Sequence, residues 1–232
     1  MSEQHALIIG VGDGLSASVA RKLAGAGYSL TLAARTQDKM KAVAAETGAA
    51  MATADASDPA AMETLFASVG SPLRVVVYNP SARVRGPIAE LDPETVRKAV
   101  EVTAFGAFLA GQQAAKRMLT QEPEQGARGT ILFTGASAGV KGFPMSSSFA
   151  MGKFAQRGLA QSMARELHPQ GVHVAWINID GAIRNPGSRE PADKPDSMLN
   201  PDGIAQAYLD LVRQDRSAWS NEITLRPWVE GF

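Results

Sequence analysis

The chain has 232 residues, 45% of them hydrophobic and 20% charged, which is an ordinary composition for a globular protein and enough for one α/β domain. Its 23 basic and 23 acidic residues cancel, so the sequence lacks the basic surface expected of a nucleic-acid-binding protein. The absence of cysteine excludes disulfides, thiolate nucleophiles and cysteine-ligated zinc. The three histidines share no metal-ligand spacing, so we expect no metal site.

The start of the chain has neither a basic segment nor a long apolar segment, and we therefore expect no signal peptide. No apolar run approaches the roughly 18 residues that a membrane-spanning helix needs. These features predict a cytoplasmic protein that does not bind membranes.

Short apolar runs predict seven strands. Several runs are continuous, such as Val75-Val76-Val77, which is typical of strands buried on both faces of a parallel sheet. The predicted strands cover residues 6–9, 29–33, 49–53, 74–78, 130–134, 173–179 and 222–225.

Helical patterns lie between these strands, the clearest over residues 16–26, 93–119 and 147–167. The second opens with Asp92-Pro93, an N-cap followed by a proline in the first turn. Alternation of strands and helices predicts βαβ units with right-handed crossovers. We therefore expect one domain over residues 1–232: a three-layer, doubly wound Rossmann fold with a mostly or wholly parallel seven-stranded sheet.

Residues 184–201 form the one irregular stretch, with four prolines and several charges. Long loops inside compact domains tend to be functional or mobile. Two interpretations remain open, a substrate lid and a plain surface connection.

A glycine turn, Gly10-Val11-Gly12-Asp13-Gly14, follows the first predicted strand and opens the first predicted helix. A diphosphate can approach the backbone N–H groups of a helix N-terminus only where no Cβ blocks it. Because the turn begins a βα repeat, it predicts a dinucleotide site. An S-adenosylmethionine-dependent methyltransferase would also have a glycine-rich first turn, but it would not explain Arg35 or Lys153.

The residues after the next three strands predict how the rest of a dinucleotide is held. A site for NAD usually places an acid after the second strand, whereas Ala34 supplies none and Arg35 could pair with a 2′-phosphate. The sequence thus favours NADP(H) over NAD(H). Asp55 is placed to meet the adenine edge, and Asn79 and Ser81 follow the fourth strand.

Together these motifs resemble the short-chain dehydrogenase/reductase family over nearly the whole chain. Gly10-x3-Gly14 is similar to the family's TGxxxGxG, Tyr78-Asn79-Pro80-Ser81 lies where NNAG is expected, and Asp180-Gly181-Ala182-Ile183 takes the place of the usual Pro-Gly segment. The resemblance implies cofactor contacts from Gly10, Gly12, Asp13, Gly14, Leu15, Arg35, Asp55, Asn79, Ser81, Lys153, Gly181 and Ile183.

The family's chemistry uses Asn, Ser, Tyr and Lys, and only the lysine is kept here. The Tyr-x3-Lys spacing is intact, but Phe149 occupies the tyrosine position before Lys153. Ala136 stands at the serine position with Ser137 beside it, and Thr103 stands at the asparagine position. The predicted catalytic residues are Lys153, Thr103, Ser137 and Phe149.

The resemblance implies hydride transfer to or from a small carbonyl, alcohol or quinone-like substrate. Acid catalysis should be weakened or non-standard, because a phenyl ring has no proton to give. Other hydroxyls in these segments, including Tyr78, are candidate replacements for the missing acid. The alternative is a non-catalytic NADP(H)-binding protein with a redox-sensing or structural role. The resemblance also implies a homodimer or homotetramer that pairs the helices 93–119 and 147–167.

Overall fold

A seven-stranded sheet forms the centre of the computed structural model, which describes residues 4–231. The strand order is β3-β2-β1-β4-β5-β6-β9, and each neighbouring pair is parallel. The strands are β1 (His5–Ile9), β2 (Ser29–Ala34), β3 (Ala50–Thr53), β4 (Leu73–Tyr78), β5 (Gly129–Thr134), β6 (Val172–Ile179) and β9 (Glu222–Leu225). The predicted doubly wound sheet is confirmed, and it is parallel throughout.

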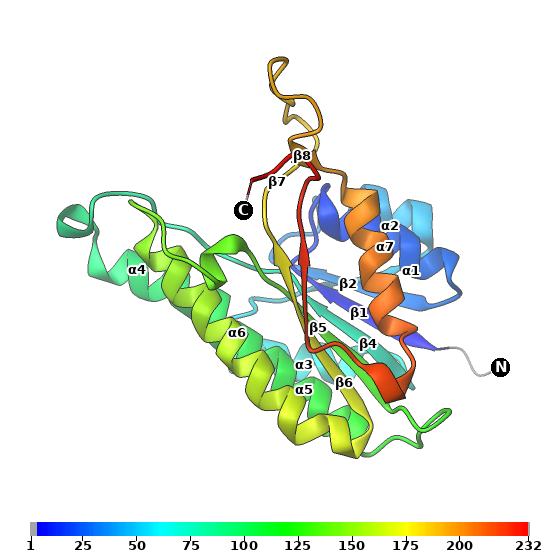
Figure 1. The fold of residues 1–232 in the computed structure, drawn as a ribbon. Coiled ribbons are helices and arrows are strands. Elements are labelled where there is room, and N and C mark those ends of the chain that lie inside the picture. Colours follow the sequence, from blue (N-terminus) through cyan, green and yellow to red (C-terminus); the bar gives the residue numbers. More distant parts are fainter. Residues whose placement is uncertain (1–3, 232) are drawn as a thin grey trace.

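Helices cover both faces of the sheet (Figure 1). On one face lie α1 (Leu15–Gly25), α2 (Lys41–Thr47) and α7 (Pro201–Val212). On the other lie α3 (Pro59–Ser68), α5 (Gly106–Leu119) and α6 (Ser147–Leu167), while α4 (Pro93–Val100) extends beyond the sheet.

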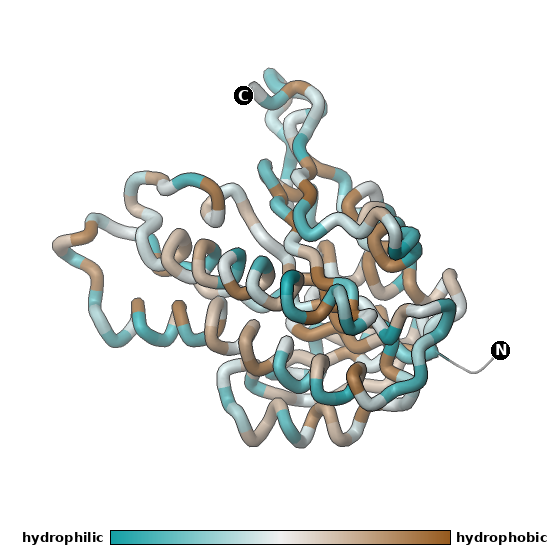
Figure 2. The backbone as a smooth tube through the Cα atoms, turned by 60° about the horizontal axis from the view of Figure 1, so that its bottom comes forward, coloured by the Kyte–Doolittle hydropathy of each residue, from teal (hydrophilic) through white to brown (hydrophobic). Residues whose placement is uncertain are grey.

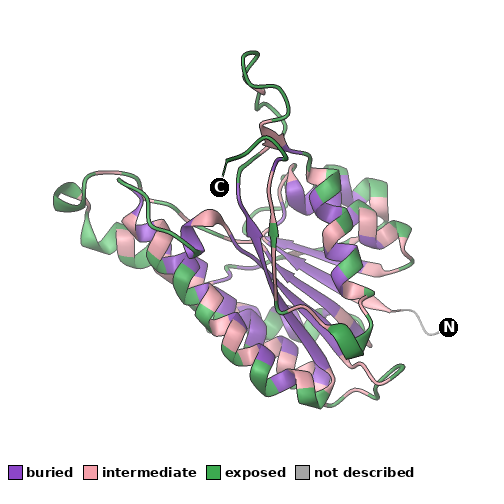
Figure 3. Cartoon of the chain, in the orientation of Figure 1, coloured by how far each residue is buried: buried purple, intermediate pink, exposed green. Residues whose placement is uncertain are grey.

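The core has two halves because successive side chains of a strand point to opposite faces. In β1, Ala6 and Ile8 join the cluster under α1 and α7, whereas Leu7 and Ile9 join the cluster under α3, α5 and α6. The central strands are buried along their length (Figure 3), which explains their continuous apolar runs. The edge strand β3 is mostly exposed.

The helices are amphipathic: brown and teal segments alternate along their tubes in Figure 2. Their apolar positions pack on the sheet, and their polar positions face outward. Within residues 4–231, no helix has both the length and the apolar character needed to cross a membrane.

The predicted helix over residues 93–119 is present, but its central turn is π-helical, which the sequence did not predict. A π-helical turn, Glu101–Phe105, separates α4 from α5. The Tyr78 hydroxyl donates to the Val102 carbonyl oxygen at 2.5 Å, and the Gln156 Nε2 donates to the Thr103 carbonyl oxygen at 3.4 Å. These side-chain donors engage carbonyl groups of the turn, and insertion of side chains into a helix ladder is a known cause of such irregularity.

The irregular stretch at 184–201 is internally hydrogen-bonded. Two short strands that the sequence did not reveal, β7 (Ala182–Ile183) and β8 (Met198–Leu199), pair in parallel. Arg184 forms an ion pair with Glu190 at 2.8 Å, and Glu190 also accepts a hydrogen bond from the Met198 backbone N–H at 3.0 Å. The segment projects beyond the sheet near α7 (Figure 1).

The first glycine of the turn provides a test of this packing. Gly10 has a φ of +82°, and a Cβ added there would lie 2.7 Å from the Pro80 ring. Gly10→Ala should therefore lower the free energy of unfolding by more than about 1 kcal/mol, measured by urea denaturation. The matched control is Gly25→Ala at the end of α1, where a Cβ would meet nothing within 4 Å; it should be neutral or stabilising by up to about 1 kcal/mol. Equal effects of the two substitutions would contradict the packing described.

Candidate functional site

A cavity of about 1100 Å³ opens at the carboxyl ends of the central strands. It lies where the strand order reverses, since β1 has β2 on one side and β4 on the other. Most of the predicted site residues line it: Gly10, Gly12, Gly14, Leu15, Arg35, Asp55, Asn79, Ser81, Ser137, Phe149, Lys153, Gly181 and Ile183. Two predicted residues lie elsewhere, since Asp13 is exposed outside the lining and Thr103 is fully buried behind it.

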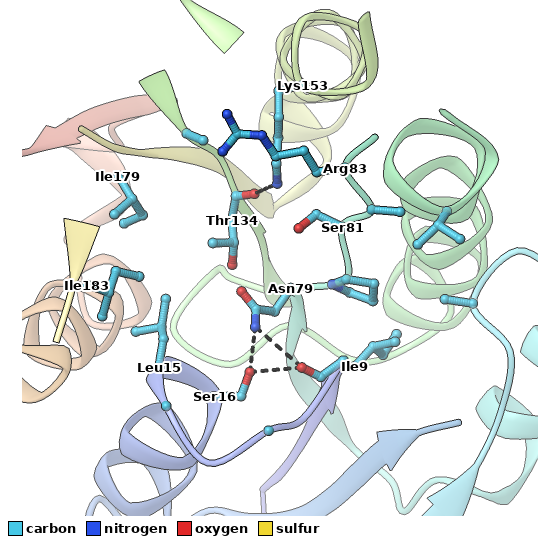
Figure 4. Close-up of a pocket in the computed structure, with 18 of the residues that line it drawn as sticks. Ile9, Leu15, Ser16, Asn79, Ser81, Arg83, Thr134, Lys153, Ile179 and Ile183 are labelled. Atoms are coloured by element: carbon cyan, nitrogen blue, oxygen red, sulfur yellow. Dashed lines mark hydrogen bonds between the residues drawn. The ribbon is translucent and has the colours of Figure 1, made fainter. Parts of the chain in front are cut away.

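The glycine turn is held by the Asn79 carboxamide (Figure 4). Its Nδ2 donates to the Ser16 hydroxyl at 2.7 Å and to the Gly10 carbonyl at 3.3 Å, and the Ser16 hydroxyl donates to the same carbonyl at 3.1 Å. Asn79 therefore fixes the turn's conformation, and its Nδ2 is already engaged by the protein.

The three glycines of the turn have different surroundings. A Cβ on Gly14 would lie 1.9 Å from the Asn185 Oδ1, and one on Gly10 would strike Pro80. A Cβ on Gly12 would meet nothing within 4 Å, so packing within the protein does not require glycine there. Because Gly12 lines the cavity at the start of a helix, the turn fits a diphosphate group.

Two basic side chains follow β2 in the chain. Arg35 and Lys39 both line the cavity, and neither forms an ion pair within residues 4–231. Opposite them, Asp55 accepts hydrogen bonds from the Ser57 hydroxyl at 2.7 Å and the Ser57 backbone N–H at 2.9 Å, which hold the pKa of its carboxyl below the usual range. Lys39 was missed from the sequence, although its position four residues after Arg35 was a usable signal.

Lys153 is 2% exposed at the other end of the cavity. Its Nζ donates to the Thr134 carbonyl oxygen at 2.5 Å and to the Gln156 Oε1 at 3.4 Å. Burial lowers the pKa of this amine to about 7, because the charged form loses its hydration. The Phe149 ring centroid, one helical turn earlier on α6, is 5.9 Å from the Nζ.

Two buried polar side chains behind the cavity, those of Gln156 and Thr103, hydrogen-bond to the elements around this lysine. The Gln156 Oε1 also accepts from the Trp176 indole at 3.3 Å, while its Nε2 reaches the π turn. The Thr103 hydroxyl accepts from the Ala82 backbone N–H at 3.0 Å. Thr103 and Gln156 therefore connect elements around Lys153 without facing the cavity. Sequence reasoning missed Gln156, because a glutamine on a helix carries no distinctive signal.

None of the chain's three tyrosines lines the cavity. Tyr78 is buried and donates to Val102, and Tyr208 is buried with its hydroxyl 2.8 Å from the Thr134 Oγ1. Burial raises the pKa of both phenols. Tyr28 directly precedes β2 and so lies at the amino ends of the strands, away from the cavity at their carboxyl ends. Tyr78, a candidate replacement for the missing acid, therefore has no route to a substrate.

The Ser148 hydroxyl, next to Phe149, is also engaged, whereas the buried Ser146 hydroxyl in the cavity lining has no hydrogen-bond partner within residues 4–231. The Ser148 hydroxyl bonds to both backbone groups of Val84, at 2.9 and 3.0 Å. Burial alone would raise the pKa of Asp180, but hydrogen bonds with Ser137 and Arg226 hold that pKa below its usual range. Ser137 lines the cavity, yet its hydroxyl is drawn to a carboxylate, which disfavours proton donation to a substrate.

Comparison with known proteins identifies the family. Residues 4–187 match the family model described as short chain dehydrogenase, so the chain belongs to the short-chain dehydrogenase family of oxidoreductases. It is 30% identical over 213 residues to L-2,3-butanediol dehydrogenase of Corynebacterium glutamicum, covering 88% of this chain and 80% of that protein.

Solved structures agree on the fold. A short-chain dehydrogenase from Rhodopseudomonas palustris has 32% identity and a TM-score of 0.81, with 97% of this chain and 99% of that chain covered. A variant of actinorhodin polyketide ketoreductase crystallised with NADPH has a TM-score of 0.86 at 21% identity, covering 97% and 96% of the two chains, and shows likeness of fold alone.

The buried amine predicts a pH-dependent cost to stability. Because the pKa of Lys153 is lowered in the folded state, the unfolded chain binds more protons between pH 7 and pH 10.5. The free energy of unfolding therefore rises with pH between pH 7 and pH 10.5. Below pH 7 the folded protein carries the full free-energy cost of burying the charged amine. In urea denaturation of the cofactor-free protein, Lys153→Met should be more stable than wild type at pH 6, and this advantage should shrink by more than about 1 kcal/mol at pH 9.

The matched control is Lys116→Met, which replaces an exposed lysine on α5. Its difference from wild type should not change between the two pH values. A pH-independent difference for Lys153→Met would show that the amine is not buried as described.

Proposed function

We propose that the chain is an NADP(H)-dependent oxidoreductase that acts on a small carbonyl or alcohol, or on a quinone-like acceptor, with weakened acid catalysis. One observation carries the proposal: Lys153 and Phe149 share a cavity with the glycine turn, and no tyrosine lines that cavity. Bound NADP(H) would supply or accept the hydride. The chain's own residues would bind the cofactor, orient it and exclude water.

The two ends of the cavity support the choice of cofactor. Arg35 and Lys39 offer charge to a 2′-phosphate, and a guanidinium can bind such a group through two parallel hydrogen bonds. Asp55, at the end of β3, lies where an adenine edge would be met. Lys153 would bind the nicotinamide ribose hydroxyls, a task that needs no tyrosine.

We propose weakened acid catalysis because the candidate proton donors in the cavity are absent, engaged or weakly acidic. Phe149 has none to give, Thr103 is turned to backbone, and Ser137 is held by Asp180. The Ser146 hydroxyl is unpartnered in the lining, but an aliphatic hydroxyl is a far weaker acid than a phenol. Positioned acid catalysis typically contributes about 10²–10⁴-fold to a rate, so turnover of simple ketones should be slow by that order. The family and the relative named for butanediol oxidation favour an enzyme over the non-catalytic alternative.

The remaining parts of the proposal concern partners. Phe105, Phe108, Met151 and Phe154 are exposed on the π turn, α5 and α6. Covering this apolar surface with a second copy would bury it from water, which supports a homodimer or homotetramer. The proposed substrate is a small organic molecule. We propose no nucleic-acid or membrane partner. The proposed location of the protein is the cytoplasm.

Cofactor preference is tested by titrating the protein with NADPH and NADH and following nicotinamide fluorescence. NADPH should bind more tightly, and Arg35→Ala and Lys39→Ala should each weaken NADPH about tenfold while leaving NADH unchanged, because each removes a charged partner of the 2′-phosphate. The control is Lys41→Ala, whose side chain pairs with Asp38 outside the cavity. No binding of either dinucleotide would refute the proposal, and tighter NADH binding would reverse the preference.

The missing acid is tested by restoring it. Phe149→Tyr combined with Ala136→Ser should raise NADPH-dependent reduction of a panel of aldehydes and ketones by about 10²–10⁴-fold over wild type. Adding Lys153→Met to that double variant should abolish the gain, since the phenol would lose its neighbouring amine. Flat activity in a folded, NADPH-binding double variant would contradict the assignment of Phe149 and Ala136 to these positions.

A further inference from the structure

Arg83 is a cavity residue with no role in holding the cofactor as proposed above. It lies in the loop after β4 and reaches into the same end of the cavity as Lys153 (Figure 4). Within residues 4–231 it forms no ion pair and no side-chain hydrogen bond. Its guanidinium instead lies against an aromatic ring, with the guanidinium carbon 5.4 Å from the centroid of Phe149.

The Phe149 ring therefore has two cationic neighbours. The Arg83 guanidinium is 5.4 Å from its centroid and the Lys153 Nζ is 5.9 Å from it. The ring's electron density attracts both groups but cannot neutralise them. The ring thus marks one end of the cavity at which two basic side chains meet, and an anion there would be attracted to the guanidinium.

No carboxylate balances these cations inside the cavity. Asp55 is the one acidic residue in the lining, and it lies at the end of β3 beside Arg35, at the adenosine end. Asp180 lies outside the lining and is bonded to Arg226. The Arg83 guanidinium at this end of the cavity is thus not balanced by a carboxylate of the lining, which favours a negatively charged ligand.

Aromatic side chains line the cavity near Lys153. Phe143 lines the cavity beside Phe149, and Lys141 lies over the Phe143 ring at 5.5 Å. Phe143 is exposed, so this wall is available to a ligand. Apolar walls with a few fixed polar groups are typical of small-molecule sites.

We propose that the substrate is an organic anion whose carboxylate or phosphate is bound by Arg83 while its apolar body lies against Phe143 and Phe149. A guanidinium suits this task because its planar fork matches either oxyanion bidentately. The inference rests on the proposed function, since it concerns the substrate of that same site. It adds the class of molecule that the site selects.

The test measures ligand binding to protein saturated with NADPH, so that the cofactor's own phosphates occupy the glycine turn. The probes are benzoate and phenyl phosphate, compared with neutral benzamide, by isothermal titration calorimetry. At least one anion should bind about tenfold or more tightly than benzamide, and the preference should fall with added salt. The better of the two anions then identifies the oxyanion that the site prefers.

Arg83→Gln should abolish the preference for the anion, and Arg83→Lys should keep part of it, because an ammonium retains the charge without the fork. NADPH affinity should be unchanged in both variants. The matched control is Arg85→Gln, two residues further along the same loop and outside the lining, which should behave as wild type.

Equal binding of the anions and benzamide, or an anion preference that survives Arg83→Gln, would overturn the inference while leaving the proposed function intact. Failure of the wild-type protein to bind NADPH would instead overturn both. The NADPH titration therefore separates the two kinds of failure.

Discussion

The reversal of strand order between β2 and β4 is the constraint on which the rest of the structure depends. From β1 the chain turns into α1 on one face of the sheet, and after β4 it passes through α4, beyond the sheet, to α5 on the other face. The carboxyl ends of these strands are thus left uncovered, which is where open parallel sheets bind ligands. The hydrogen bonds of Asn79 to Ser16 and Gly10 join the two strand ends and fix the glycine turn at the opening.

The second organising feature is the burial of one amine. Burying a lysine is costly unless its polar atom is bonded, and Lys153 is bonded to the end of β5 and to Gln156. Phe149 lies one helical turn away on the same face of α6, so that helix presents the lysine and the phenyl ring together. The side chains that hold the amine are all in place, whereas Phe149 has no proton to give at its position on the helix. In the function proposed above, binding of the cofactor and protonation of the substrate are therefore separable.

Strong local patterns made most of the fold predictable. Apolar runs located all seven strands of the sheet, because strands buried on both faces need apolar residues at every position. The π turn at Glu101–Phe105 was not predictable, since the side chains that bond to its carbonyl groups are distant in sequence. In the site, Gly10 and Lys153 were readable from motif spacing. Arg83 was not, because the role proposed for it depends on the ring it lies against rather than on its neighbours in sequence.

The central claim is that a nicotinamide dinucleotide spans the cavity from the glycine turn to Lys153, with Phe149 where a proton donor would be expected. A crystal structure of the protein with NADPH tests this most directly. We expect the diphosphate at the N-terminus of α1, and the hydroxyls of the nicotinamide ribose about 3 Å from the Lys153 Nζ. A nicotinamide bound away from Lys153, or a tyrosine hydroxyl moved into the cavity beside it, would contradict the account.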